Sequence, residues 1–212
     1  MIAPKMSPDA TTDHDLLRLM LAGDESSFVA LYRRWQASLY RFALRMSGSA
    51  AIAEDVVQEV FIVLLREGAR YAPEKGSVGS FLYGITRNHV LRRLERERNF
   101  VPIAEEDDES GAPPPPESLV ALPDPVGDLA RRETIQAVRE AVLALPPHYR
   151  EVVVLCELHE MNYADAAIVL GCPVGTVRSR LNRARALLSE RLRSANEQDV
   201  ATRSINPARC LI

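Results

Sequence analysis

Apolar residues recur at helical spacing through most of the first hundred residues. After Asp24, which suits the N-cap of a helix, apolar and aromatic side chains fall three or four positions apart up to Gly48, a residue typical of helix ends. The same pattern predicts a second helix between Ser49 and Gly68, and a third that begins near residue 80 after a loop. This part of the chain is therefore predicted to be helical.

The second half of the chain continues the helical pattern. A helical segment is predicted up to Pro146, where a Pro-Pro pair breaks it and opens the next helix. The short apolar run from Val152 to Leu155 fits either a helix or a strand, but no alternating pattern bounded by hairpin turns occurs elsewhere. The fold class predicted is all-α.

The segment NYADAAIVLGCPVGTVRSRLNRARALL has the pattern of a helix-turn-helix unit. Asn162 suits the N-cap of a short helix, Gly171 ends it, and Pro173 opens a longer helix after about three residues. A short helix, a tight turn with glycine and a longer helix are the parts of a DNA-binding helix-turn-helix.

The longer helix has an apolar side and an arginine-rich polar side. At about 100° per residue, Val177 and Leu181 face the core and Ser179 points away from it. Arginine, asparagine and small polar side chains suit contacts with base edges and phosphates. A solvated arginine-rich face is the alternative, which the independent turn pattern disfavours. Ser179 is flanked by Thr176, Asn182 and Arg183, with Arg178 and Arg180 at the two edges.

The net charge of the whole chain argues against a nucleic-acid partner, but the distribution of the charged residues along the chain favours one. The chain has 26 Lys and Arg against 29 Asp and Glu, a net charge of -3. Residues 102–128 hold eight of the acids, no Lys or Arg, and seven of the fourteen prolines, as expected for a linker. The rest of the chain has an excess of about five positive charges, 26 basic against 21 acidic residues.

The composition predicts five parts. Two small helical domains are joined by an acidic Pro-rich linker, and the second is a helix-turn-helix domain. A tail that starts at Ser194 is expected to be disordered or to serve as a regulatory extension. The predicted parts are a disordered N-terminus at 1–13, a domain at 14–100, the linker at 101–127, a domain at 128–193 and the tail at 194–212.

Signals of other function classes are missing from the sequence. The three cysteines form no Cys-x-x-Cys pair and the four histidines are scattered, so we expect no metal, no cofactor and a reducing intracellular, cytoplasmic setting. No GxxxxGK[ST], HExxH or GxSxG motif occurs, which disfavours an enzyme. No signal peptide and no apolar stretch of eighteen residues is present, so we expect no membrane insertion.

Four motifs together resemble those of a known family. AEDVVQEVF, GITRN followed by arginines, LPPHYREVVVL and CPVGTVRSRLNRAR look like an extracytoplasmic-function (ECF) sigma factor of the sigma-70 family, over about residues 15–192. The resemblance implies a protein that binds the RNA polymerase core and directs it to promoters with -35 and -10 elements. It also implies that trapping of unpaired -10 bases helps to open the duplex.

A polar stripe on the second predicted helix is the candidate polymerase-binding site. Asp55, Gln58, Glu59 and Ile62 lie at i, i+3, i+4 and i+7, so they share one face of that helix. A merely solvated face is the alternative. The resemblance implies that this stripe binds the clamp helices of the largest polymerase subunit, and that the C-terminal domain meets the flap region.

The resemblance also assigns the two DNA contacts. The loop and helix near residues 71–98 correspond to the part that captures the -10 element, where aromatic rings stack on bases and arginines follow the backbone. In the -35 reader, Arg178, Ser179, Asn182 and Arg183 are expected near bases and Thr176 and Arg180 near phosphates. The candidate -10 residues are Tyr71, Tyr83, Arg87, Asn88, Arg92, Arg93 and Arg96.

Other interpretations remain open at this point. The acidic linker either threads the polymerase channel, as the resemblance implies, or is a solubilising spacer. An anti-sigma factor is a further partner that only the resemblance implies. The competing functions are a stand-alone helix-turn-helix transcription factor that binds palindromic DNA as a dimer, and a sigma-like adaptor that does not initiate transcription.

Overall fold

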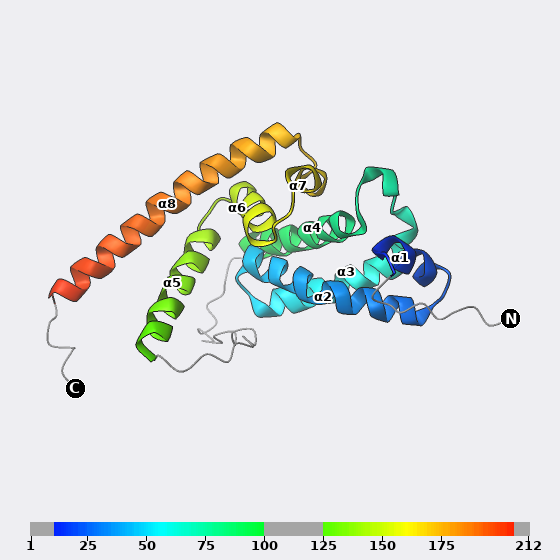
Figure 1. Ribbon diagram of the computed structural model, residues 1–212, viewed down its shortest axis with the longest axis horizontal. Coiled ribbons are helices and arrows are strands. Elements are labelled where there is room, and N and C mark those ends of the chain that lie inside the picture. The colour runs from blue at the N-terminus through cyan, green and yellow to red at the C-terminus, as the bar shows by residue number, and fades with distance from the viewer. Residues whose placement is uncertain (1–10, 100–124, 206–212) are drawn as a thin grey trace.

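The computed structural model describes residues 11–99 and 125–205, with side chains placed over 11–98 and 132–194. Helices and the turns between them make up this part of the chain, and it contains no strand (Figure 1). The predicted all-α class is confirmed. In chain order the helices are α1 (Asp13–Leu21), α2 (Glu25–Ser47), α3 (Ala50–Glu67), α4 (Val78–Asn99), α5 (Pro125–Leu143), α6 (Pro147–Val153), α7 (Tyr163–Leu170) and α8 (Val174–Ile205).

The predicted helix ends are confirmed by their hydrogen bonds. The Asp24 carboxylate accepts hydrogen bonds from the backbone N–H groups of Ser26 and Ser27 at the start of α2. Gly48 ends that helix in the left-handed conformation, with φ of 77°. Ser49 caps α3 through the N–H of Ile52. Local sequence chemistry therefore sets where these helices begin and end.

Helices α1 to α4 form the N-terminal lobe. Helices α2, α3 and α4 pack on one another around a core in which Phe42 and Val60 are fully buried. Helix α1 was not predicted. It begins at Asp13 with Thr12 as its N-cap, and the Asp13 carboxylate accepts hydrogen bonds from the Arg34 guanidinium at 2.6 Å and the Trp35 indole at 3.1 Å. These two bonds fasten α1 to α2.

Helices α5 to α8 form the C-terminal lobe. The predicted caps of the helix-turn-helix are present: Asn162 accepts from the N–H of Asp165, and Gly171 ends α7 with φ of 62°. Val177 and Leu181 are buried, as the apolar side of α8 predicted. The ambiguous run from Val152 to Leu155 is helical, and it passes from α6 into a π-helical turn, η4 (Val154–Leu158).

Two predicted boundaries differ from the helices observed. Helix α8 continues to Ile205, because no helix-breaking residue occurs before Pro207, so the part of the predicted tail up to that point is helical rather than disordered. Helix α5 already begins at Pro125, within the end of the predicted linker. The rest of that linker, residues 1–10 of the predicted disordered N-terminus and residues 206–212 of the tail lie outside the described residues.

The two lobes pack against each other, which the sequence did not predict. Helix α7 lies on α4, and α5 and η4 lie on α2 (Figure 1). The buried apolar side chains of both lobes form one contiguous cluster. Arg150 of α6 donates hydrogen bonds to the carbonyl of Met46 at the end of α2 and to the carbonyls of Leu143 and Leu145 in its own lobe. We call the whole contact of α5, α6, η4 and α7 with α2 and α4 the lobe interface.

Candidate nucleic-acid interface

The exposed face of α8 gathers the residues expected to read the -35 element. Arg178, Ser179, Asn182 and Arg183 are all solvent-exposed, while Thr176 and Arg180 are half-buried at the sides of this face. The placement follows from the burial of Val177, Leu181 and Ala184, because a helix that buries one side must turn the other to solvent. We call these six residues the α8 face.

The polar groups of the α8 face are held in defined positions. The Ser179 hydroxyl donates to the Thr176 carbonyl at 3.1 Å. The Arg178 guanidinium lies over the Tyr163 ring of α7, 5.8 Å from its centroid, within the range of a cation–π contact. Within the described part of the chain, Arg178, Arg180 and Arg183 form no ion pair. Three positive charges on this face are therefore free to meet phosphates.

Tyr71, the first of the candidate -10 residues, stabilises the loop before α4. Its hydroxyl donates to the Gly76 carbonyl at 3.1 Å, and its ring lies 5.7 Å from that of Phe81. Burial is the main reason that the pKa of Tyr71 is raised. The ring thus supports the loop from within, and only part of it is accessible to a base.

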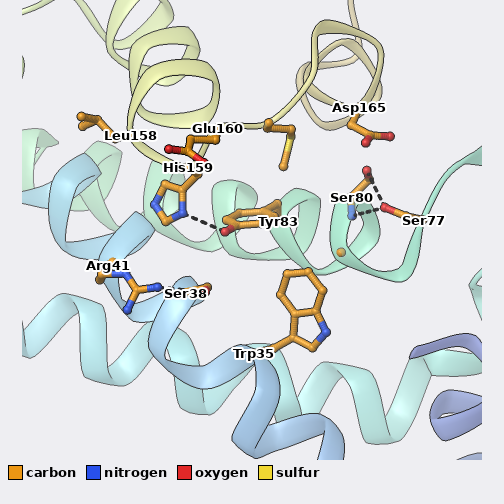
Figure 2. A pocket seen from close by; sticks show the side chains of 12 residues that line it. Trp35, Ser38, Arg41, Ser77, Ser80, Tyr83, Leu158, His159, Glu160 and Asp165 are labelled. Atoms are coloured by element: carbon orange, nitrogen blue, oxygen red, sulfur yellow. Dashed lines mark hydrogen bonds between the residues drawn. The ribbon is translucent and has the colours of Figure 1, made fainter. Parts of the chain in front are cut away.

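Tyr83 is buried in the lobe interface. Its side chain is 6% exposed, and its hydroxyl lies 2.8 Å from Nδ1 of His159 (Figure 2). Burial raises the pKa of Tyr83 to about 12. The family resemblance implied a stacking role for the Tyr83 ring, but in this conformation the C-terminal lobe covers it.

Arg87 is also engaged with the C-terminal lobe. Its Nε lies 3.0 Å from Oε1 of Glu151 on α6, and its Nη2 donates to Oε2 at 3.1 Å. Glu151 is 2% exposed, so its carboxylate is buried in this ion pair, in which Nη2 donates a hydrogen bond and Nε has no hydrogen-bond partner. Arg87 is the only candidate -10 residue with a carboxylate partner in the C-terminal lobe, among the described side chains.

The remaining candidate -10 residues lie farther along α4. Asn88, Arg92 and Arg96 are exposed, and Arg93 is half-buried. The Arg93 guanidinium forms an ion pair of 3.2 Å with Asp55 on α3. The C-terminal half of α4 is thus accessible, while its middle is covered.

The polar stripe of α3 is exposed along its whole length. Asp55, Gln58, Glu59 and Ile62 all face solvent, with Ile62 40% exposed. Leu65 continues the stripe one turn on and is 54% exposed, which the sequence analysis did not assign. Its spacing of three residues from Ile62 places it on the same face of the helix, so the sequence could have indicated it. Exposed apolar residues beside acids suit a protein-binding surface.

A cavity of about 430 Å³ opens between the lobes. Figure 2 shows Trp35 and Arg41 of α2 on one side, His159 from the segment after η4 on the other, and Ser80 and Tyr83 of α4 between them. Burial, together with nearby Arg45 and Arg41, lowers the pKa of His159 to about 4, and its Nε2 has no hydrogen-bond partner. His159 is therefore neutral at pH 7.

Glu151 and His159 are two further residues that the sequence analysis did not assign, both at the lobe interface. Glu151 could have been found from its position directly before the apolar run VVVL, because an acid next to a buried run is itself drawn into the core. His159 had no such signal. Among the described residues, no group of three or more His, Cys, Asp or Glu side chains is placed to hold a metal ion, and no helix is long and apolar enough to cross a membrane.

Comparisons with known proteins match both lobes. The family model for sigma-70 region 2 matches residues 31–100, and that for sigma-70 region 4 matches residues 135–188. The ECF RNA polymerase sigma factor SigM of Mycobacterium tuberculosis is 34% identical over 182 residues, 85% of each chain. The ECF sigma factor SigE of Mycolicibacterium smegmatis is 32% identical over 197 residues, 90% of this chain and 70% of the relative.

A solved structure has the same arrangement of helices over most of its length. CnrH in complex with the cytosolic domain of CnrY matches with a TM-score of 0.63 and 25% identity, over 86% of this chain and 97% of that chain. The α8 face lies within the region 4 match. The α3 stripe and α4 lie within the region 2 match.

Proposed function

The chain belongs to the ECF sigma factors of the sigma-70 family, and we propose which of its surfaces carry each step of that work. As an alternative sigma factor it directs RNA polymerase to promoters. It therefore acts as a DNA-binding transcription initiation factor. The roles of single residues below are part of the proposal.

The α3 stripe is the proposed contact with the polymerase core. Asp55 and Glu59 supply negative charge, and Ile62 and Leu65 supply apolar area that is already exposed. Such a surface suits the basic and apolar clamp helices of the largest subunit, which the family resemblance implies as its partner. The C-terminal lobe would meet the flap region, so that one sigma factor touches the core at two places.

The α8 face is the proposed reader of the -35 element. Arg178, Ser179, Asn182 and Arg183 stand on the exposed side of the second helix of a helix-turn-helix, where short polar groups and arginines reach base edges in the major groove. Thr176 and Arg180, at the sides, contact phosphates. One observation carries this assignment. In the described structure no carboxylate pairs with Arg178, Arg180 or Arg183, so all three positive charges are available to DNA.

Helix α4 and the preceding loop are the proposed site for single-stranded -10 bases. Asn88, Arg92 and Arg96 are accessible to a DNA backbone, and Arg93 is next to them. Tyr71 adds a partly accessible ring, and Tyr83 and Arg87 complete the surface only when the C-terminal lobe moves away. Trapping of unpaired bases there favours the open duplex without any nucleotide hydrolysis.

An anti-sigma factor is a further proposed partner. The family resemblance implies it, and the related CnrH was solved with a protein partner, the cytosolic domain of CnrY. We also place the work of this chain in the cytoplasm, where RNA polymerase transcribes. Affinity purification from cells, followed by identification of proteins other than polymerase subunits, tests this partner.

Run-off transcription tests the proposed function as a whole. The full chain is mixed with polymerase core on genomic fragments, and new start sites are mapped. We expect start sites that appear only with the chain present and that are lost with the double variant R178A/R183A. A core complex that produces no new start sites would indicate an adaptor that does not initiate.

A further inference from the structure

Tyr163, the first residue of α7, contacts two arginines of α8. Helices α7 and α8 pack against each other as the two helices of the helix-turn-helix. Arg178 and Arg185 are seven positions apart, close to two full turns, so they share one side of α8. The Arg178 guanidinium lies over the Tyr163 ring, 5.8 Å from its centroid, and Arg185 interacts with the same tyrosine.

The tyrosine is itself held in place. Its side chain is half-buried and packs against the apolar core. The Arg185 guanidinium forms an ion pair with Glu157 of η4 and donates a hydrogen bond to its carboxylate. That hydrogen bond, and in smaller part the interaction with Tyr163, raise the pKa of Arg185. Tyr163 therefore belongs to a chain of contacts that runs from η4 to α8 and includes Arg178.

The Tyr163 ring limits the freedom of an exposed arginine. A long side chain in solvent samples many rotamers, and ordering it on binding costs conformational entropy. Arg178 is exposed and forms no ion pair within the described part of the chain. Because a planar guanidinium stacks on an aromatic face, the ring orients Arg178 before DNA arrives, and less freedom is lost on binding.

An aromatic ring orients a guanidinium without using its hydrogen-bond donors. A carboxylate partner would bind the same fork of N–H groups that a guanine edge or a phosphate needs. The face of a ring instead attracts the positive charge of the whole group. The N–H groups of Arg178 therefore remain available to a base while the side chain is held.

We propose that Tyr163 is a positioning residue for the -35 contact, whose ring holds Arg178 in the orientation from which the guanidinium reads one base pair. This inference rests on the proposed role of Arg178 in the α8 face. Tyr163 acts through Arg178 rather than on DNA. It therefore determines how strongly one base pair is preferred and leaves the choice at the other base pairs unaffected.

Substitutions of Tyr163 in the full chain separate the role of its ring from that of its hydroxyl. Tyr163→Phe keeps the ring over Arg178, and Tyr163→Leu removes it. Tyr149→Leu is the control, because it makes the same change at another half-buried tyrosine of the C-terminal lobe. Each variant is bound to polymerase core. Its affinity is measured for a promoter mapped by run-off transcription and for single-base variants of that promoter's -35 element.

Arg178→Ala first identifies the base pair that Arg178 reads. At this pair we expect Y163L to lower the preference for the favoured base at least about threefold, the factor that corresponds to a cation–π contact at an exposed site. Preferences at the other pairs should stay as in wild type, and Y163F and Y149L should keep all of them. The double variant R178A/Y163L should resemble R178A, because the ring then has no guanidinium to hold.

The outcomes separate this inference from the proposed function. An unchanged preference in folded Y163L, at a base pair that R178A does relax, would overturn the inference and leave the assignment of Arg178 standing. If R178A relaxes no base pair, the assignment of Arg178 to a base fails and the inference fails with it. Equal weakening of every promoter by Y163F and Y163L would place the Tyr163 hydroxyl on a phosphate, which contradicts a positioning role.

A second variant and a folding measurement keep the test independent of Y163L. Tyr163→Gln also removes the ring, and it should lower the preference at the same base pair by the same factor. Circular dichroism shows which variants keep the wild-type helicity. A folded Tyr163→Gln variant with wild-type preferences would overturn the inference.

Discussion

Tyr83 and His159 share a hydrogen bond of 2.8 Å across the lobe interface, although 76 positions separate them in the chain. The bond uses Nδ1 of the imidazole and leaves Nε2 buried without a partner. Arg41 and Arg45 lie near the ring, and both disfavour a positive charge on it. The lobe interface therefore holds a neutral histidine that acid would charge.

The free energy of unfolding should fall in acid because of His159. Its pKa is about 4 in the folded chain, below the ordinary 6.5, so the unfolded chain takes up a proton that the folded chain does not. This contribution is complete above pH 6.5 and is lost as the pH falls from 6.5 towards 4. Urea unfolding at pH 7 and pH 5 measures it.

The matched variants for this prediction replace one histidine each. His159→Gln removes the titrating group, so its loss of stability between pH 7 and pH 5 should be smaller than that of wild type. His148→Gln, at an exposed position, should keep the wild-type loss. Equal losses in wild type and H159Q would show that His159 is not buried in solution.

Gly48, at the end of α2, packs against the C-terminal lobe. Its φ of +77° is unfavourable for other residues, and an added Cβ would lie 3.1 Å from Cδ1 of Leu143 on α5. Gly48→Ala should therefore cost about 1–2 kcal/mol for the left-handed backbone and more for displacement of Leu143. The free energy of unfolding from urea titration measures the sum.

Gly171 provides the reference for the backbone cost alone. It has φ of +62°, and an added Cβ would meet no atom within 4 Å. Gly171→Ala should thus destabilise the chain less than Gly48→Ala. If both substitutions cost the same, Leu143 does not rest on Gly48 in solution.

Local features were predictable from the sequence, and contacts between distant residues were not. Asp24, Gly48 and Gly171 act on their own helix ends, so residue type and neighbours are enough to place them. The exposed side of α8 followed from the spacing of its apolar residues. Arg87 and Glu151 are 64 positions apart in the chain. The spacing of apolar residues predicts which side of a helix is buried, but not which surface of the other lobe it contacts.

Arg178 offers a test of the α8 face. Arg178→Ala should weaken promoter binding by the polymerase complex by about 1–3 kcal/mol and relax the choice at one base pair of the -35 element, if it reads a base. Affinity for a set of single-base promoter variants measures both effects. Arg191→Ala is the control, because it lies 13 residues along the same helix, about 20 Å away. Uniform weakening for every sequence would instead place Arg178 on a phosphate.

The α3 stripe can be tested by charge reversal. Asp55→Lys with Glu59→Lys should abolish capture of polymerase core by the tagged chain, since the introduced lysines would repel a basic partner. Both positions are exposed, and the lost pair of Asp55 with Arg93 is worth at most about 1 kcal/mol, so the fold should persist. Pull-down and circular dichroism measure capture and helicity.

Glu67 is the matched control on the same helix. It is exposed and pairs with Arg70, away from the stripe. Glu67→Lys should leave capture of the core unchanged. Retained capture by the double variant, with wild-type helicity, would contradict the role of the stripe.

Footprinting of one promoter, with the chain alone and with the chain bound to polymerase core, tests the central claim most directly. The account predicts protection of both the -35 and -10 elements with core, and at most weak protection near -35 without it, because in the isolated chain Tyr83 and Arg87 of the -10 surface are bonded to the C-terminal lobe. Strong protection of two symmetric half-sites by the isolated chain would contradict the account and indicate a dimeric helix-turn-helix regulator.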